Sequence, residues 1–379
     1  MKTIGINLIA LFSEQGSGAF RYIKLILQEM GSYNLFDCKF IVYKQKCISE
    51  EYLDIPKTLD LEYVNVPNVG RGFKRILFEQ TLFYKYIKPC DVFYSYCSSM
   101  PLFLNARKVF TLHDVYFLTE KERYGAIQRN YLKFVTWLYI QASSKILTVS
   151  QFSKNEIMKY YRVSSDKLII TYNFVKPIPK IGSIIGDVLD EKGNRIDLKV
   201  PFFLYVGNIH PGKNITRMVK GFEIFNKKAH KYQLLICGKP ANNSDAIIAV
   251  IREYSDVHYL GYQSREVVDY LFQNCVAVVL ISLCEGFGIP PLEGIQNHKP
   301  ALVSSGTSIP EVIGNAGVCV NPRNVEDIAN GYEKIIKNKK SFEPYYDLQI
   351  KKFSPKDSVE AFMNTLGISA PSRKVSCQF

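Results

Sequence analysis

Short apolar runs alternate with longer amphipathic segments along almost the whole chain. Runs that are short and nearly continuously apolar are typical of strands covered on both faces of a parallel sheet. The strands predicted in this way are Ile4–Leu8, Cys38–Tyr43, Val92–Tyr96, Lys108–Leu112, Lys145–Val149, Phe202–Val206, Gln233–Cys237, Val257–Leu260, Ala277–Ile281, Ala301–Ser304 and Gly317–Val320. Helices are predicted between them, for example over Gly18–Met30 and Tyr124–Ala142. Strands that alternate with helices indicate βαβ units, so the sequence predicts an α/β fold.

One segment interrupts this alternation and divides the chain. Residues 177–200 contain prolines, glycines and mixed charges without a sustained period, which indicates a linker or a surface excursion. The flanking parts, 1–176 and 201–353, are each long enough for one doubly wound domain. Residues 354–379 follow as a terminal segment. Ligands of such domains bind beyond the carboxyl ends of the strands, so we expect the functional site in a cleft between the two domains.

The cysteines and the N-terminal residues indicate the cellular compartment of the protein. The chain of 379 residues has 9 cysteines, an odd number, and none are spaced as C-x-x-C. The apolar N-terminal run is interrupted by Gly5 and Asn7, which favours a first strand over a signal peptide. No uninterrupted apolar stretch is long enough to span a membrane. These features predict a cytoplasmic protein with reduced cysteines.

The formal net charge of +13 indicates an anionic partner, which could be nucleic acid, an acidic lipid surface or a phosphorylated substrate. No recognised nucleic-acid motif accompanies the charge, so we expect no nucleic acid partner. Basic and aromatic residues share helical segments of the N-terminal half. This pattern suits contact with an anionic membrane surface, or simply helices whose apolar stripe faces the core. The residues are Arg71, Phe73, Lys74, Arg75, Phe78, Phe83, Tyr84, Lys121, Arg123, Arg129, Tyr131, Lys133, Phe134 and Trp137.

The most specific segment is Cys284–Gly294, which follows a predicted strand and turns through glycines and prolines into a helix. Proline suits the first turn of a helix, and the free amides of that turn point at whatever binds there. Glu285 and Glu293 on either side of the turn can accept hydrogen bonds from the vicinal hydroxyls of a sugar or ribose. A simpler interpretation of Glu293 is a first-turn carboxylate favoured by the helix dipole.

Three other places carry candidate chemistry. Lys213 lies in the loop after the strand Phe202–Val206, where a cation can stabilise a departing phosphate. The loop between the first strand and first helix contains Gly16 and Gly18, which fit either a phosphate-binding helix start or a plain tight turn. His113 and Asp114 follow a strand, although a lone histidine is often structural. No D-x-D arrangement that would hold a divalent ion is present, so we expect no metal and no cofactor.

These motifs resemble those of a known enzyme family. Glu285 and Glu293 match the E-x7-E motif of retaining GT-B glycosyltransferases, and the surroundings are similar to group 1, family 4. Four further segments resemble the family in the expected order along nearly the whole chain. They are Leu147–Lys154, Tyr205–Asn214, Tyr259–Tyr262 and Ser308–Gly314.

The resemblance implies a GT-B architecture, with two Rossmann-like doubly wound domains facing across a cleft. It also implies that a terminal helix over Ser354–Leu366 crosses back to the N-terminal domain. The implied activity is transfer of a hexose from a nucleotide sugar to a glycan or lipid-linked acceptor, with retention of configuration. The segments further resemble bacterial mannosyltransferases of surface-polysaccharide assembly, which favours GDP-mannose as donor over a UDP-sugar. A lipid-linked acceptor would place the protein at the inner membrane face.

The resemblance also assigns roles to residues. By it, Glu285 contacts hydroxyls of the donor sugar, Glu293 the ribose, and Lys213 the diphosphate, while His113 lies near the reacting sugar. The remaining donor-binding residues would be Gly16, Gly18, Gly286, Phe287 and Gly288, with Tyr262 bordering the nucleobase and Asp114 in an open role.

In one place the sequence departs from the family. Asn208 stands where family members often carry an arginine that clamps the phosphates. The sequence leaves open whether His210 or Arg217 compensates.

Two alternative functions remain at this stage. A nucleotide-sugar epimerase can share the two-domain architecture, and a basic binding protein of similar fold would need no catalysis. The E-x7-E segment followed by Ser308–Gly314 favours transfer over epimerisation. A non-catalytic protein predicts loss of the site residues, yet Lys213, Glu285 and Glu293 are all present.

Overall fold

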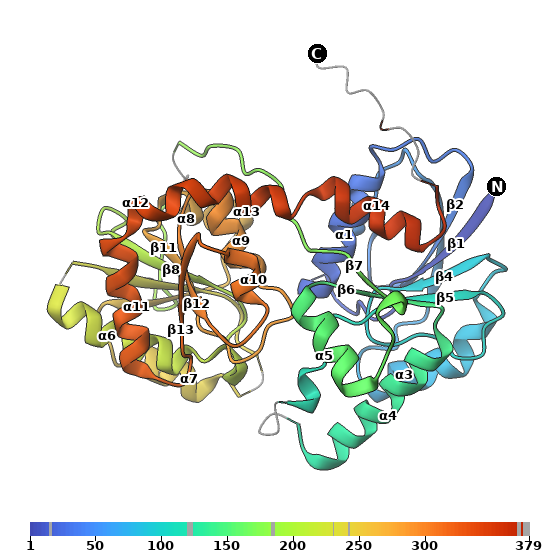
Figure 1. The fold of residues 1–379 in the computed structure, drawn as a ribbon, viewed down its shortest axis with the longest axis horizontal. Helices are drawn as coiled ribbons and strands as arrows, with labels where there is room; N and C mark the ends of the chain where they lie inside the picture. The colour runs from blue at the N-terminus through green and yellow to red at the C-terminus, as the bar shows by residue number, and fades with distance from the viewer. Residues whose placement is uncertain are drawn as a thin grey trace. The chain divides into compact units, whose positions relative to one another are not determined.

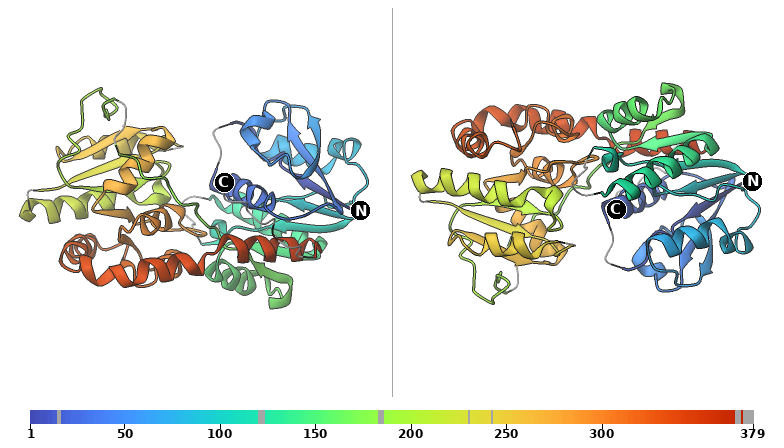
Figure 2. Two further views of the ribbon diagram at one scale, coloured as in Figure 1. Left: turned by 90° about the horizontal axis from the view of Figure 1, so that it is seen from above. Right: turned by 90° about the horizontal axis from the view of Figure 1, so that it is seen from below.

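The computed structural model describes residues 1–14, 17–119, 124–182, 186–229, 231–241, 243–369 and 373. The chain forms two compact units (Figure 1). The first consists of Met1–Phe174 with Ser354–Phe379, and the second of Val175–Phe353. Each unit is built on one parallel sheet that carries helices on both faces (Figure 2). The predicted α/β fold class is confirmed.

The sheet of the first unit has the order β3-β2-β1-β4-β5-β6-β7, and all its pairings are parallel. Its strands are β1 (Lys2–Asn7), β2 (Cys38–Gln45), β3 (Asp60–Val66), β4 (Val92–Ser95), β5 (Arg107–Thr111), β6 (Lys145–Thr148) and β7 (Leu168–Ile170). Its helices are α1 (Gly18–Met30), α2 (Glu50–Leu53), α3 (Phe73–Gln80), α4 (Ala126–Ala142), α5 (Gln151–Tyr161) and α14 (Pro355–Thr365).

The sheet of the second unit has the order β10-β9-β8-β11-β12-β13 and is also parallel throughout. Its strands are β8 (Phe202–Val206), β9 (Gln233–Cys237), β10 (Val257–Gly261), β11 (Ala277–Leu280), β12 (Ala301–Ser304) and β13 (Gly317–Val320). Its helices are α6 (Ile215–Ala229), α7 (Asp245–Ile251), α8 (Arg265–Asn274), α9 (Ile289–Gln296), α10 (Ile309–Ile313), α11 (Val325–Lys337), α12 (Lys339–Phe342) and α13 (Tyr346–Lys352).

The central strands explain why the apolar runs are nearly continuous. In β8, Phe203 and Tyr205 belong to the core on one face of the sheet, whereas Phe202 and Leu204 belong to the core on the other. All four side chains are buried. Successive residues of a strand point to opposite faces, so a strand with helices on both sides must be apolar at every position.

Two edge strands, β3 and β7, were not predicted from the sequence. In β3 the polar residues Asp60, Glu62 and Asn65 interrupt the apolar ones. The free edge of an edge strand meets solvent, and polar residues there also discourage pairing with another chain. Strand β7 contains only three residues and offers too little pattern to recognise.

The segment that the sequence marks as a linker packs onto the second unit. Val188 and Ile196 are buried in the core on the side of the sheet where α8 lies. The side chain of Gln273 on α8 accepts a hydrogen bond from the Ile181 amide at 2.9 Å and donates one to the Pro179 carbonyl at 2.7 Å. The described part of this segment is therefore held by both apolar and polar contacts.

Helix α14 belongs to the first unit, although 179 residues of the second unit separate it from Phe174. It lies beside α1, as the red and blue ends of the chain show in Figure 1. The Phe362 ring meets the Tyr94 ring edge-on, with 4.9 Å between centroids. Arg107 Nη2 donates to the Thr365 carbonyl at 2.9 Å. The core of the first unit is thus completed by residues from the far end of the sequence.

We expect Phe362→Ala to lower the free energy of unfolding by about 3 kcal/mol, the usual cost of emptying a large core site. Hydrogen exchange followed by mass spectrometry should show faster exchange in β1, β4 and α1, with no change in the second unit. The matched change in the second unit is Phe222→Ala, for which we expect the reverse distribution. Equal loosening of both units by Phe362→Ala would contradict the assignment of α14 to the first unit.

Candidate functional site

The strand order of the second sheet reverses between β8 and β11, and loops that follow such neighbours diverge to leave room for a ligand. The loops after these two strands contain Lys213 and Glu285. They are joined at their bases, since the Leu283 amide donates to the Gly212 carbonyl at 2.9 Å. Asn214 Nδ2 also donates to the Ile281 carbonyl at 3.1 Å. The fold therefore brings together two loops that are far apart in the sequence.

Lys213 and Glu285 form an ion pair between Nζ and Oε1 at this point. Ser282 Oγ donates a second hydrogen bond to the same carboxylate oxygen, at 2.7 Å. The two side chains are 19% and 14% exposed, so the pair is mostly buried but still reachable. An ammonium group beside a carboxylate can bind an anion and a hydroxyl group of one ligand at the same time.

The turn after Glu285 is held by the segment Ser308–Gly314. Ser308 Oγ lies 2.5 Å from the Glu285 carbonyl and 3.1 Å from the Phe287 carbonyl, and donates to them. Gly288 has φ +102°, a conformation that side chains rarely adopt, and an added Cβ would lie 3.2 Å from Ile309. This geometry explains why the turn through Gly286, Phe287 and Gly288 needs its glycine at position 288.

Glu293, the second carboxylate of the motif, lies on α9 and is almost completely buried. Arg265 Nη1, from the start of α8, contacts Glu293 Oε1 at 2.7 Å, and Arg265 Nη2 contacts Asp269 Oδ1 at 2.6 Å. The Arg265 side chain remains half exposed. Sequence reasoning missed this arginine, because no local pattern connects the first residue of α8 with a carboxylate on α9.

The other expected residues of the second unit lie around these loops. Asn208 is exposed, and its carbonyl accepts a hydrogen bond from the Tyr205 hydroxyl at 3.0 Å. Arg217 Nη1 donates to Asn214 Oδ1 at 2.9 Å, which ties it to the residue after Lys213. The exposed Tyr262 ring has Lys239 Nζ 4.0 Å from its centroid.

His210 lies in the same loop as Lys213. Its ring is packed against the backbone of that loop, and a Cβ added at Gly212 would lie 3.1 Å from His210 Cε1. His210 and Arg217 therefore both lie next to Lys213 in the structure.

In the first unit, His113 follows β5 at the carboxyl edge of the sheet. Its Nε2 is 3.0 Å from the Tyr96 carbonyl, and because a carbonyl only accepts, Nε2 carries the proton. Nδ1 is then the acceptor. Burial lowers the pKa of His113 to about 4, although the hydrogen bond to Tyr96 acts in the opposite direction. At neutral pH this ring is uncharged and can accept a hydrogen bond from a hydroxyl.

The remaining candidates of the first unit have local roles. Asp114 Oδ1 accepts from the Tyr116 amide at 3.2 Å, which shapes the turn after His113. Gly16 lies outside the described residues. Gly18 starts α1, whose N-cap Ser17 accepts from the Phe20 amide at 3.2 Å. A side chain at Gly18 would meet no atom of the described residues within 4 Å.

The prediction of a lipid-facing role was wrong for Arg75. Its Nη1 contacts Glu79 Oε2 at 3.0 Å and donates to Ser99 Oγ at 2.7 Å. Glu79 is fully buried and also accepts from Asn7 Nδ2 at 2.8 Å. Arg75 therefore balances a buried carboxylate, whereas Arg71 and Lys74 are exposed. Lys121 and Arg123 lie outside the described residues.

Solved structures share this architecture. The crystal structure of Anabaena Alr3699/HepE in complex with UDP and glucose superposes with a TM-score of 0.72 at 14% identity. The match covers 97% of this chain and 100% of that chain. The motif residues Lys213 and Glu285 follow the two strands between which the strand order reverses. This arrangement and the likeness to the solved structure define the fold as GT-B, the two-domain class of glycosyltransferases.

Family models place the chain more closely. The model for glycosyl transferases group 1 matches residues 189–348, and the model for glycosyltransferase family 4 matches residues 46–177. The two matches together span most of the chain. The protein belongs to the group 1 glycosyltransferases of family 4, as its motifs indicated.

Two curated relatives share part of their length with this chain. The O-antigen chain mannosyltransferase B of Escherichia coli is 28% identical over 229 residues, which is 59% of each chain. The O-antigen chain mannosyltransferase RfbU of Salmonella typhimurium is 29% identical over 243 residues, 63% of this chain and 62% of the relative. The chain thus spans about three fifths of the length of these relatives.

We expect Arg265→Met to lower the free energy of unfolding by about 2 kcal/mol, because it leaves Glu293 buried without its cation. The loss is below that of a fully buried pair since Arg265 is half exposed. The double variant with Glu293→Gln should recover most of the lost free energy of unfolding, as measured by urea denaturation. Arg252→Met, which removes an exposed pair with Glu191, is the control and should cost less than about 1 kcal/mol. If the effects of the two single changes simply add in the double variant, the coupling between Arg265 and Glu293 is contradicted.

The His113 titration predicts a pH dependence of stability. In the unfolded chain this histidine binds a proton below pH 6.5, but in the native protein only near pH 4. Above pH 6.5 the histidine is neutral in both states and does not change the free energy of unfolding. As the pH falls from 6.5 toward 4, the free energy of unfolding decreases by up to about 1.4 kcal/mol per pH unit, because only the unfolded chain takes up the proton. His113→Gln should remove this slope from the unfolding free energy. The same change at the exposed His298 should leave the slope as it is.

Proposed function

We propose that this protein transfers a hexose from a nucleotide sugar to a glycan or lipid-linked acceptor in cell-surface glycan biosynthesis, with retention of configuration. Mannose from GDP-mannose is the proposed donor group. The names of the two curated relatives, both O-antigen mannosyltransferases, support mannose and a polysaccharide acceptor. Transfer from a UDP-sugar is the alternative within the same chemistry.

The observation that carries the proposal is the contact between Lys213 and Glu285 beyond β8 and β11. Departure of a nucleoside diphosphate builds negative charge on its outer phosphate. A fixed, partly buried cation at that position stabilises the charge more strongly than water does. Lys213 is proposed to take this role, so the protein itself supplies the charge that the leaving group needs.

The carboxylates are proposed to hold the two sugar rings of the donor. Glu285 would exchange its contact with Lys213 for hydroxyls of the transferred hexose, which places the ammonium on the phosphate next to it. Glu293, held by Arg265, would accept from the ribose. His113, neutral with Nδ1 as acceptor, is proposed to bind a further hydroxyl of the hexose. The acceptor hydroxyl would attack from the face that the diphosphate leaves, with the phosphate taking its proton.

The donor is identified by slow hydrolysis of a panel of nucleotide sugars, with water replacing the acceptor. We expect GDP-mannose to be cleaved faster than GDP-glucose and the UDP-hexoses. The anomer of the product, read by NMR before mutarotation, tests retention. Preferred cleavage of a UDP-sugar would replace the donor assignment, and conversion to an epimer without cleavage would replace transfer itself.

Replacing Glu285 by glutamine keeps its shape and removes the charge. We expect the rate of transfer to fall by about two orders of magnitude, as when one transition-state contact is lost. The affinity for GDP alone should not fall, because Lys213 is then released from its carboxylate partner. Glu266→Gln, an exposed carboxylate on α8, is the matched control for the loss of one charge. Unchanged turnover of Glu285→Gln would contradict the donor-site assignment.

We also propose a cytoplasmic protein that contacts the inner membrane face through its first unit. Exposed basic residues there, Arg71, Lys74 and Lys133, together with the half-buried Arg129, support attraction to anionic headgroups. The cysteines of the described part of the chain are free thiols, as a reducing compartment requires. Among the described residues, no helix is both long and apolar enough to cross a bilayer.

A further inference from the structure

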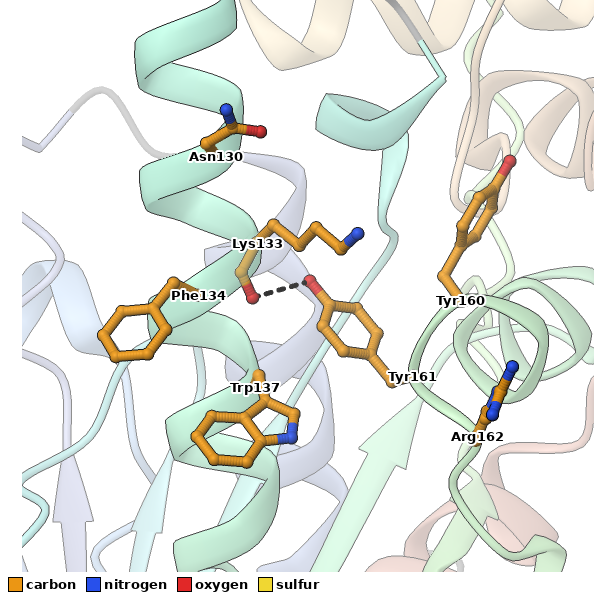
Figure 3. A pocket seen from close by; sticks show the side chains of 7 residues that line it. All are labelled: Asn130, Lys133, Phe134, Trp137, Tyr160, Tyr161 and Arg162. Atoms are coloured by element: carbon orange, nitrogen blue, oxygen red, sulfur yellow. Dashed lines mark hydrogen bonds between the residues drawn. The ribbon is translucent and has the colours of Figure 1, made fainter.

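A pocket in the first unit is lined by none of the candidate donor-site residues. It lies between α4 and the end of α5 and has a volume of about 320 Å³, which is at the small end of ligand pockets. Its lining residues are Asn130, Lys133, Phe134, Trp137, Tyr160, Tyr161 and Arg162. In Figure 3 the Tyr161 ring lies between the helices, with its hydroxyl directed at the Lys133 carbonyl, 3.4 Å away.

The two sides of the pocket differ in chemistry. Phe134 and Trp137 lie together on α4, with ring centroids 6.1 Å apart and planes 26° from parallel. Lys133 extends its ammonium away from these rings, toward the side where Arg162 and Tyr160 lie (Figure 3). The pocket therefore combines an apolar aromatic wall with two cations, which suits a ligand with a hydrocarbon chain and an anionic head.

The apolar wall continues along α4 beyond the pocket. Ile127 is 88% exposed and Phe134 is 58% exposed, and Tyr131 and Trp137 are also exposed. Positions 127, 131 and 134 follow helical spacing and share one face. Large apolar side chains gathered on one surface mark a contact with a partner or a membrane. A small water-soluble ligand in the pocket would leave Ile127 in water, whereas a bilayer would cover the whole face.

We propose that this pocket binds one anionic phospholipid of a membrane. The phosphate of the lipid lies between Lys133 and Arg162, and part of one acyl chain lies against Phe134 and Trp137. The neighbouring residues Ile127 and Tyr131 then enter the interface of the same bilayer. The inference deepens the proposed membrane contact and does not depend on the proposed transferase activity.

The test uses the only tryptophan of the chain, Trp137, which lines the pocket. Dihexanoylphosphatidylglycerol, used below its micelle concentration, is a single anionic lipid without a bilayer. We expect it to shift the Trp137 emission to shorter wavelength, because an acyl chain replaces water around the indole. The zwitterionic dihexanoylphosphatidylcholine should bind at least tenfold more weakly, and glycerol phosphate, which has no chain, should give no shift.

A charge variant isolates the cationic side. Lys133→Gln combined with Arg162→Asn should weaken binding to phosphatidylglycerol about thirtyfold, the effect of two cations near an anionic surface. Asparagine is chosen because residue 162 has a positive φ, which asparagine tolerates. The control combines Lys57→Gln with Lys85→Gln, two exposed lysines of the same unit outside the pocket, and should bind as the wild type does.

The chain-binding side is tested by Phe134→Ser, which keeps the reporter. It should weaken binding of the short lipid and also sedimentation with phosphatidylglycerol vesicles. Equal binding of both lipids would overturn the proposal in favour of a detergent-like site. A shift with glycerol phosphate would instead indicate an anion site, and a shift with mannose oligosaccharides alone would indicate a glycan site. If dilution of the protein removes both the emission shift and a dimer seen by size-exclusion chromatography, the proposal is overturned in favour of a second copy of this chain in the pocket. Donor hydrolysis measured without lipid reports on the proposed transferase separately.

Discussion

The reversal of strand order between β8 and β11 is the constraint on which the candidate site depends. Parallel strands end at the same edge of a sheet, and the reversal sends their following segments to opposite faces. Hydrogen bonds that cross between the two loops join them near their bases, from the Leu283 amide to the Gly212 carbonyl and from the Asn214 side chain to the Ile281 carbonyl. Lys213 and Glu285 meet beyond those bonds. Their position is therefore set by the sheet and by neutral hydrogen bonds, so that a ligand can replace their mutual contact without rearranging the loops.

Both units bury one carboxylate near the carboxyl edge of the sheet and balance it with an arginine. Glu293 has Arg265 in the second unit, and Glu79 has Arg75 in the first. A buried charge is costly unless it is paired and hydrogen-bonded, so such a group restricts its surroundings to one arrangement. In the first unit this arrangement includes Asn7 at the end of β1, whose amide group donates to both Glu79 and Ser95. The polar residues beyond the strands are thereby fixed before any ligand arrives.

The sequence predicted most of the sheet and the loops of the candidate site, because central strands and glycine turns leave local patterns. Helix α1 was predicted with its observed bounds, and the Glu285 turn was recognised from its spacing. Edge strands such as β3 were missed, since one solvent-facing side dilutes their apolar pattern. The partners of buried charges were missed for a different reason. Arg265 looks like an ordinary surface cation in the sequence, and only packing shows that it faces a carboxylate on another helix. Arg75 and Glu79 lie four residues apart on α3, so their pairing is local, but the sequence does not show that Glu79 is buried.

The return of α14 to the first unit has a consequence for how the protein is made. During synthesis the second unit is contiguous and complete once residue 353 has emerged, whereas the first unit still lacks the helix that carries Phe362. Domains generally fold as units while the chain leaves the ribosome. Here the unit encoded first is the last to be finished, and until then its surface beside α1 and Tyr94 is left uncovered. The nascent first unit therefore keeps apolar surface exposed, and it can complete its core only after α14 has emerged.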